Sequence, residues 1–255
     1  MNLRRYLDLI IYKTFADLRS EAAKTYIGFL WWVLDPIIFM TIFYIVFGLL
    51  MQRGTENYVP FLLTGLVAWR WFQATIIHGA NAILAGRGLM RQVYIPKILF
   101  PLINMMTDLL KFIVVLAILL VFLWFYGFGI NISYLAFPLV LLVQFTLIAG
   151  LTILLSGLVP FLPDLRLLTE HILQLMFFVS GIFYDASQIP EQYKMYFYLN
   201  PMANIVEAYR SILMYGQWPD WSALSVIFLV GLGILLIAFR LIKSQDYYYP
   251  KLAAG

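Results

Sequence analysis

Arg70 has the clearest capacity for binding chemistry, because it lies within an apolar segment, between Trp69 and Trp71, with no acidic residue within four positions. An ionisable side chain at membrane depth is costly and usually faces a cavity or a partner. A guanidinium binds phosphates and acidic sugars, and nearby aromatic faces, including those of Phe72 and Tyr44, can stack on sugar rings. The pattern predicts that these five residues line a conduit. The alternative is that the aromatic residues are ordinary interfacial anchors.

The other ionisable residues in apolar segments favour structural roles. Asp108 and Lys111 are three positions apart, so they share a helix face and can neutralise each other. Asp35 precedes a proline near the start of an apolar segment, where it can face the interface or cap backbone donors. His78 and His171 occur without carboxylates at metal-ligand spacing, so we expect no metal site.

Motifs for covalent chemistry are missing from the sequence. There is no G-x-x-x-x-G-K-[ST] phosphate-binding loop, no H-E-x-x-H zinc motif and no G-x-S-x-G nucleophile elbow. The chain has no cysteine, which excludes disulfides and thiolate metal sites. We therefore expect a protein that is not an enzyme, contains no cofactor and does not itself hydrolyse ATP through a phosphate-binding loop.

The composition is that of an integral membrane protein. Of the 255 residues, 63% are hydrophobic and only 12% are charged, which is too apolar for a soluble domain of this size. The formal net charge is +4, but the basic residues flank apolar segments and do not form a stripe through a polar domain. A nucleic-acid partner is therefore not expected.

Apolar segments long enough to cross a bilayer, at about 20 residues per crossing, recur along the whole chain. We expect a single all-α domain over residues 1–255 with six spans, at residues 29–51, 58–84, 99–126, 134–161, 167–183 and 221–241.

An amphipathic helix is expected before the first span, over residues 1–25. Apolar residues recur there with helical period, and charged residues fill the other face, so this helix should lie in the membrane interface. The segment that follows contains Gly28, Trp31 and Trp32, which we interpret as a hinge and an interfacial anchor. A plain aromatic belt is the alternative.

The distribution of Lys and Arg predicts the orientation, since cytoplasmic flanks carry an excess of them. With six spans and a cytoplasmic N-terminus, twelve of the 17 basic residues fall inside and three outside, with Arg70 and Lys111 within spans. Both termini should therefore be cytoplasmic.

Two connections are expected to carry short helices. The cytoplasmic stretch 86–96, bounded by glycines and Pro96, is interpreted as a short helix presented to a partner, or alternatively as an ordinary basic loop. The outer stretch 185–220 should contain two short helices, over 190–199 and 204–214, because Asn200 precedes Pro201 and is pushed out of helical geometry. These helices would cap an exit, or alternatively form a folded loop without a gating role.

The order of several motifs resembles one family over essentially the whole chain. The motifs are Tyr26-Ile-Gly-Phe-Leu-Trp-Trp-Val-Leu-Asp-Pro36, Pro60-Phe-Leu-Leu-Thr-Gly-Leu-Val-Ala-Trp69, the basic loop ending at Pro101, Ile189-Pro-Glu-Gln-Tyr193, Asn200-Pro-Met202 and Tyr209-Arg210. They look like the permease subunit of the ABC exporters for bacterial cell-surface polysaccharides, which export O-antigen, capsule and teichoic acid. In the loop 162–166 only Asp164 matches the family's Arg-Asp pair, because Pro163 replaces the arginine.

The resemblance implies an inner-membrane homodimer with two separate ABC ATPase subunits, which bind ATP and Mg, and a lipid-linked polysaccharide as substrate. O-antigen is the first candidate and capsule the second. Gly28, Trp31 and Trp32 would form the polysaccharide portal beside membrane lipids. Contact with the ATPase would involve Arg87, Leu89, Met90, Arg91 and Tyr94. The periplasmic gate would involve Asn200, Pro201, Tyr209 and Arg210.

Three other functions remain as alternatives. An ABC exporter permease for drugs or lipids would rarely show so many tryptophans and tyrosines along its spans. A secondary transporter driven by an ion gradient should show internal repeats and paired acids at the midplane, and no convincing repeat is visible. A membrane-embedded glycosyltransferase should carry exposed paired carboxylates or a metal motif on a loop.

Overall fold

The computed structural model describes residues 3–24, 26–50, 57–90, 92 and 94–249, and its regular structure within these ranges is entirely helical. The longer helices are α1 (Leu3–Ala23), α2 (Trp31–Phe43), α3 (Tyr58–Ala80), α6 (Leu99–Tyr126), α7 (Phe137–Leu158), α8 (Asp164–Val179), α10 (Pro201–Leu213) and α11 (Trp221–Gln245). The shorter ones are η1 (Gly28–Leu30), η2 (Tyr44–Leu50), α4 (Ala82–Ala85), α5 (Arg87–Met90), η3 (Ile132–Ala136), η4 (Ala186–Gln188) and α9 (Glu191–Tyr198).

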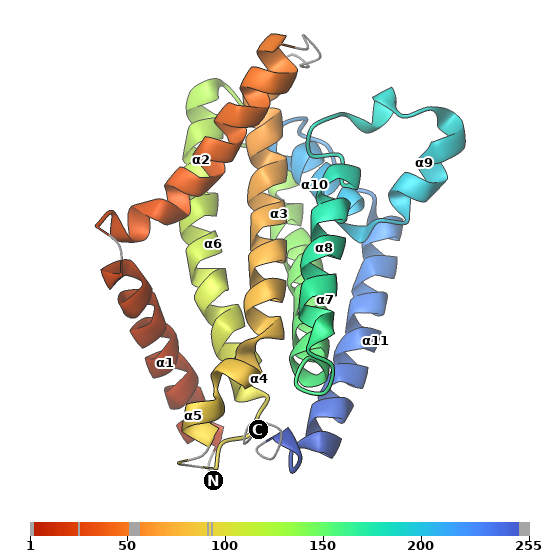
Figure 1. The fold of residues 1–255 in the computed structure, drawn as a ribbon. Coiled ribbons are helices and arrows are strands. Elements are labelled where there is room, and N and C mark those ends of the chain that lie inside the picture. The colour runs from red at the N-terminus through yellow and green to blue at the C-terminus, as the bar shows by residue number, and fades with distance from the viewer. Residues whose placement is uncertain (1–2, 25, 51–56, 91, 93, 250–255) are drawn as a thin grey trace.

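The helices form an elongated bundle with two distinct ends (Figure 1). We call the end that carries the start of α1, helix α5 and the end of α11 the lower end, and the opposite end the upper end. Helices α3, α6, α7, α8 and α11 run between these ends in alternating directions, and α2 rises to the upper end from the middle of the bundle.

The helices differ in how well they match the six expected spans. Among the described residues, four helical segments are long and apolar enough to cross a membrane, namely Gly28–Val46, Leu99–Tyr126, Ile132–Leu158 and Trp221–Gln245. The expected span 58–84 is divided into α3 and α4, and the expected span 167–183 corresponds to α8, which has only 16 residues. Helix α8 is shorter than any of the four, and α3, although it has 23 residues, is not among them.

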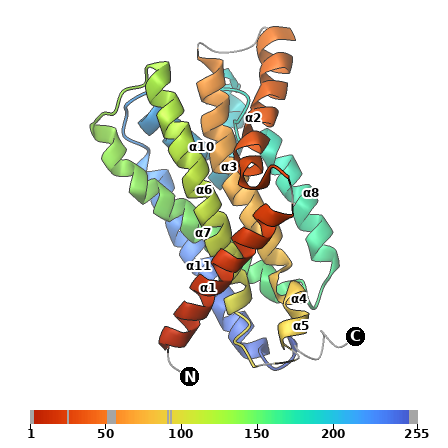
Figure 2. The same ribbon diagram turned by 90° about the vertical axis from the view of Figure 1, so that its left-hand side faces the viewer.

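Helix α1 crosses α6 obliquely and packs against it, as Figure 2 shows. The apolar side chains of Leu7, Ile11 and Phe15 face outward and are more than half exposed. Leu9 and Ile10 pack instead on a core cluster at the lower end. The helix is therefore apolar on two sides, and its place in the membrane interface stays a prediction.

Glycines allow the closest contacts between helices. A Cβ atom on Gly150 of α7 would lie 2.9 Å from the carbonyl oxygen of Gly231 on α11, so these two backbones meet only because neither residue has a side chain. Close approach through small residues is a typical way for membrane helices to associate. Gly28 differs, because its φ of +59° forms the turn that joins α1 to η1 and α2.

The outer stretch 185–220 contains α9 and α10, whose bounds lie within a few residues of those expected. The break between them is confirmed. The side chain of Asn200 accepts a hydrogen bond from the backbone N–H of Met202 at 3.0 Å, and Pro201 occupies the first turn of α10.

Arg210 joins α10 to α3 and to the loop after α8. Its guanidinium is buried and donates hydrogen bonds to the carbonyl oxygens of Gly181 at 2.7 Å, Ile182 at 2.9 Å and Phe61 at 3.2 Å. The guanidinium carbon also lies 3.3 Å from the ring centroid of Phe61. These carbonyls and the buried guanidinium satisfy one another's hydrogen-bonding capacity, so the contact determines how α10 packs on the bundle.

Gly65 makes room for this contact, which gives a prediction about stability. A Cβ atom at Gly65 would lie 2.8 Å from Nη2 of Arg210, so the Gly65→Ala variant must displace the guanidinium from its carbonyls. We expect a loss of about 2 kcal/mol or more in the free energy of unfolding, the cost of one or two hydrogen bonds to a charged group. Thermal unfolding of the purified protein in nanodiscs measures it.

Gly233→Ala is the matched control. Gly233 also lies within a helix, and a Cβ atom there would meet nothing within 4 Å. Alanine favours helix by about 1 kcal/mol over glycine, so this variant should be neutral or more stable. Equal unfolding midpoints for the two variants would contradict the role of Gly65.

Candidate functional site

A pocket of about 340 Å³ lies where the start of α2 meets α1, α3 and α6. We call it the inner pocket. It brings together residues that are far apart in the sequence, including Trp31 and Trp32 of the expected portal and Arg70 and Trp71 of the expected conduit. Its lining is Glu21, Trp31, Trp32, Asp35, Pro36, Val67, Arg70, Trp71, Ala74, His78, Asp108, Lys111, Phe112 and Val115.

Arg70 has a counter-charge on another helix, although no acidic residue lies within four positions of it in the sequence. Its Nη2 lies 2.9 Å from Oδ2 of Asp35 on α2, and its guanidinium carbon lies 3.9 Å from the ring centroid of Phe39. The acid is 35 positions away in the sequence, outside the window in which a local partner can be recognised. The two groups are close enough to form an ion pair, but their orientation does not give a hydrogen bond. Nη2 has no hydrogen-bond partner among the described residues.

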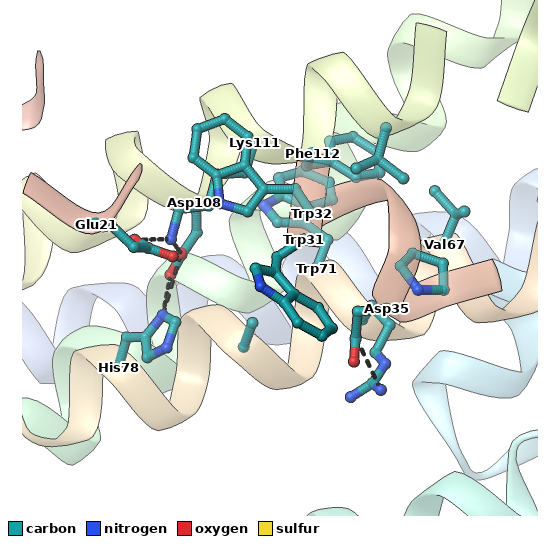
Figure 3. A pocket seen from close by; sticks show the side chains of 14 residues that line it. Glu21, Trp31, Trp32, Asp35, Val67, Trp71, His78, Asp108, Lys111 and Phe112 are labelled. Atoms are coloured by element: carbon teal, nitrogen blue, oxygen red, sulfur yellow. Dashed lines mark hydrogen bonds and ion pairs between the residues drawn. The ribbon is translucent and has the colours of Figure 1, made fainter. Parts of the chain in front are cut away.

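The opposite side of the inner pocket holds a network of four ionisable groups, which Figure 3 shows beside the two tryptophans. Nζ of Lys111 lies 2.5 Å from Oε2 of Glu21 and 3.5 Å from Oδ1 of Asp108, which confirms the Asp108–Lys111 pair. Nδ1 of His78 lies 2.8 Å from Oδ2 of Asp108. The network thus ties the end of α1 to α3 and α6, and a second pocket of about 430 Å³ lies on its other side.

The aromatic residues expected to line a conduit divide into two groups. Trp71 lines the inner pocket and stacks on Phe112, with ring centroids 4.0 Å apart. Trp69 and Phe72 are almost completely buried in the main core and do not line this pocket. Tyr44 begins η2 and packs partly buried against the same core. A conduit lining does not fit the burial of Trp69 and Phe72. The role of Arg70, Trp71 and Tyr44 in a conduit stays a prediction.

The inner pocket can bind a group that both donates and accepts hydrogen bonds beside a flat apolar surface. Trp31 and Trp32 form its wall, and Trp31 is 43% exposed at the rim. The cations Arg70 and Lys111 are already paired with carboxylates, so an incoming phosphate would have to displace an acid to reach them. Sugar hydroxyls can instead bridge the existing charges, with a sugar ring on an indole face.

Four of the five residues expected to contact an ATPase lie at the lower end. The fifth, Arg91, lies outside the described residues. Arg87 and Leu89 are exposed on α5, which has only four residues. Met90 is buried in the lower core cluster, so it anchors this segment and presents no outward contact.

Tyr94 connects the segment after α5 to the end of α11. Its hydroxyl donates a 2.8 Å hydrogen bond to Oδ2 of Asp246, which raises the pKa of Tyr94. The Nζ of Lys97, a buried residue, lies 3.7 Å from the same carboxylate oxygen and 4.4 Å from the Tyr94 ring centroid. A movement of the segment after α5 would therefore displace the end of α11 as well.

The residues expected to form a gate hold the upper end together. Asn200 caps α10 and donates a hydrogen bond to Oγ of Ser180 at 2.9 Å. Tyr209 is fully buried and donates to Oε1 of Gln144 at 2.6 Å, and Gln144 donates to the carbonyl oxygen of Ala68 at 2.8 Å. Arg210 is hydrogen-bonded to buried carbonyl oxygens, as described above. The side chains of Asn200, Tyr209 and Arg210 therefore all point into the bundle.

Sequence reasoning missed several partners in these contacts. Gln144 and Asp246 gave no local signal, because each acts on a residue more than 60 positions away. His78 could have been connected to Asp108, since both interrupt apolar segments that must pack together, and a buried carboxylate needs a partner.

Comparison with known families gives a match over most of the chain. Residues 19–214 match the family described as ABC-2 type transporter. The matched region includes the inner pocket, α5 and α10.

Curated relatives match the chain over nearly its whole length. The O-antigen export system permease protein RfbA of Klebsiella pneumoniae is 27% identical over 252 residues, covering 98% of this chain and 97% of the relative. The protein of that name from Myxococcus xanthus is 28% identical over 245 residues, covering 95% and 94%. The polysialic acid transport protein KpsM of Escherichia coli is 24% identical over 233 residues, covering 90% of each chain.

The four-group network of the inner pocket gives a prediction about α1. Lys111→Met removes the cation between Glu21 and Asp108 and leaves the buried Asp108 carboxylate with His78 alone. We expect a loss of about 2 to 3 kcal/mol in the free energy of unfolding, since breaking a buried ion pair strands a charge. Limited proteolysis should also cut α1 faster.

Lys13→Met is the control, because Lys13 pairs with Asp17 on the exposed side of the same helix. Exposed pairs contribute about 0 to 1 kcal/mol, so this variant should behave like the unaltered protein. If both variants lowered the unfolding midpoint equally, the network would not hold α1 to the bundle.

Proposed function

The chain belongs to the ABC-2 type transporter family, and from this premise we propose that it is the channel-forming permease subunit of an ATP-driven polysaccharide exporter. Its substrate would be a lipid-linked polysaccharide, with O-antigen as the first candidate and capsule as the second. The observation that carries the proposal is the match to O-antigen export permeases over 95% or more of this chain.

The match to a polysialic acid transport protein supports the second candidate. It covers 90% of both chains at 24% identity, slightly below the identity to the O-antigen permeases. Both kinds of relative are named for long glycans, which favours polysaccharides over drugs or membrane lipids as the exported class. Family membership also disfavours a secondary transporter or a glycosyltransferase.

The proposed architecture is a homodimer of six-span subunits in the bacterial inner membrane with both termini in the cytoplasm. Four helical segments are long and apolar enough to span, and α3 and α8 run alongside them between the same two ends. The excess of basic residues on the flanks supports a cytoplasmic lower end. Two ABC ATPase subunits, which would bind ATP and Mg, would dock there on Arg87 and Leu89.

The inner pocket would receive the head of the lipid-linked glycan. Its wall of Trp31 and Trp32 offers flat faces to a sugar, and Arg70 could exchange Asp35 for a phosphate as the lipid head moves past. ATP binding would close the ATPases and push on α5. The hydrogen bond between Tyr94 and Asp246 would transmit this movement to α11.

Arg70→Ala tests the substrate role of the inner pocket. We expect glycan-stimulated ATP hydrolysis and glycan export to fall at least tenfold in proteoliposomes of the permease–ATPase complex, while ATP hydrolysis without glycan stays unchanged. The physical reason is the loss of the cation that pairs with Asp35 in the pocket wall. Arg166→Ala, at an exposed pair on α8, is the control. Undiminished export by Arg70→Ala would remove Arg70 from the mechanism.

Arg87→Glu tests the docking surface. The side chain is exposed on α5, so the variant should fold normally but place a negative charge where the ATPase is proposed to bind. We expect less ATPase to co-purify and a loss of glycan-stimulated ATP hydrolysis. Lys194→Glu makes the same charge reversal on α9 at the upper end and should have no effect. Full co-purification and full stimulation with Arg87→Glu would show that the ATPase docks elsewhere.

A further inference from the structure

A further polar cavity, of about 210 Å³, lies at the upper end of the bundle. We call it the outer pocket. It is enclosed by the loop that joins α8 to α9 and by one side of α10, and the segment after α10 completes it. No residue of the inner pocket lines it, so the two pockets are separate.

Several polar side chains in the outer pocket have no protein partner. The hydroxyls of Ser211 and Tyr215 and the side-chain amide of Gln217 line the cavity, and none of them forms a hydrogen bond with another described residue. Tyr215 and Gln217 are exposed and Ser211 is partly exposed, so water or a ligand can reach all three side chains. The cavity therefore presents donors and acceptors to whatever enters it.

Two carboxylates add acceptors. Asp185 uses Oδ1 to accept the backbone N–H of Ser187 at 2.8 Å, and Glu207 accepts only a long 3.4 Å hydrogen bond from Tyr198, so each has an oxygen left over. Burial raises the pKa of Glu207. Arg210 lies at the floor of the cavity, but its hydrogen bonds go to carbonyl oxygens, so it is not available for an anion.

The remaining wall is aromatic. Tyr184 and Phe197 form a pair with ring centroids 6.2 Å apart and planes tilted by 51°, and Tyr215 is half exposed near the opening. Flat apolar faces beside carboxylates, hydroxyls and an amide fit a ring that carries hydroxyl groups.

We propose that the outer pocket is a saccharide-binding subsite that takes one sugar ring of the exported glycan after it has crossed the membrane. The carboxylates of Asp185 and Glu207 accept hydrogen bonds from sugar hydroxyls, Gln217 and Ser211 complete their coordination, and the aromatic wall packs on the ring. That the sugar comes from an exported glycan rests on the proposed function. That the pocket fits a sugar ring rests on its lining residues alone.

A metal ion fits the outer pocket less well than a sugar. Calcium takes six to eight oxygen ligands and usually several carboxylates. Only Asp185 and Glu207 supply carboxylates here, the cationic Arg210 lies at the floor, and within the described residues no three His, Cys, Asp or Glu side chains are grouped for a metal. Neutral sugar hydroxyls also carry no charge that the nearby arginine would repel.

Saturation-transfer NMR on the permease–ATPase complex in nanodiscs, without glycoside detergents, tests the subsite directly. The probes are the methyl glycosides of glucose, galactose and mannose. We expect transfer to at least one of them, with a loss of at least fivefold in Glu207→Ala and in Gln217→Ala. Glu191→Ala, an exposed acid on α9 outside the pocket, should keep the signal. Unchanged unfolding midpoints show that the variants are folded.

The outcomes separate the two proposals. No transfer from any probe, or a signal that survives Glu207→Ala and Gln217→Ala, would overturn the subsite even if the complex exports glycan. Binding of radioactive calcium that is lost in Asp185→Asn, without sugar transfer, would also overturn it in favour of a cation site. Pocket-dependent sugar transfer in a complex that fails to export glycan would support the subsite and contradict the proposed function.

Discussion

The contact between Arg210 and three carbonyl oxygens is the constraint on which the upper half of the molecule depends. A buried guanidinium without an acid in contact is tolerated only when backbone carbonyls take its N–H groups. Here they come from α3 and from the loop after α8, so one side chain on α10 joins three parts of the chain. Gly65 leaves the space, and Tyr58 adds a 3.0 Å hydrogen bond to the carbonyl oxygen of Phe183 in the same loop.

In the lower half of the molecule, ion pairs join helices that are separate in the sequence. Glu21, Lys111, Asp108 and His78 connect α1 to α3 and α6, and Asp35 with Arg70 connects α2 to α3. Packing between helices gains little from hydrophobicity in a bilayer, so polar contacts and close backbone approach have to hold the helices in place. Ion pairs therefore attach α1 and α2 to the rest of the bundle, and the same charged side chains line the inner pocket. A ligand that competes for those charges would loosen α1 and α2, which links binding to movement.

Much of the fold follows from local patterns in the sequence. The helical form of the first segment, four of the long apolar helices and the break at Asn200 are confirmed, because each depends on hydrophobic period or on a residue next to proline. The pairing of side chains was less predictable. Arg70 has no acid nearby in the sequence, and its partner on α2 is found only when the helices are packed. Trp69 and Phe72 were expected beside Arg70 in a conduit, but successive residues of a helix point in different directions, and these two face the core.

The positions of the two pockets bear on how a glycan could pass. Between them lies a core whose side chains, such as Leu62, Leu66 and Trp69, have no exposed surface. Such a core is packed at the density of an organic crystal and cannot admit a polymer without losing its stability. A path through the middle of one chain is therefore excluded for the proposed function. The polysaccharide would have to travel along an outer face of the bundle, and shielding it from lipid requires a second surface of the same height. A second copy of the chain supplies such a surface, which is the physical reason to propose a homodimer.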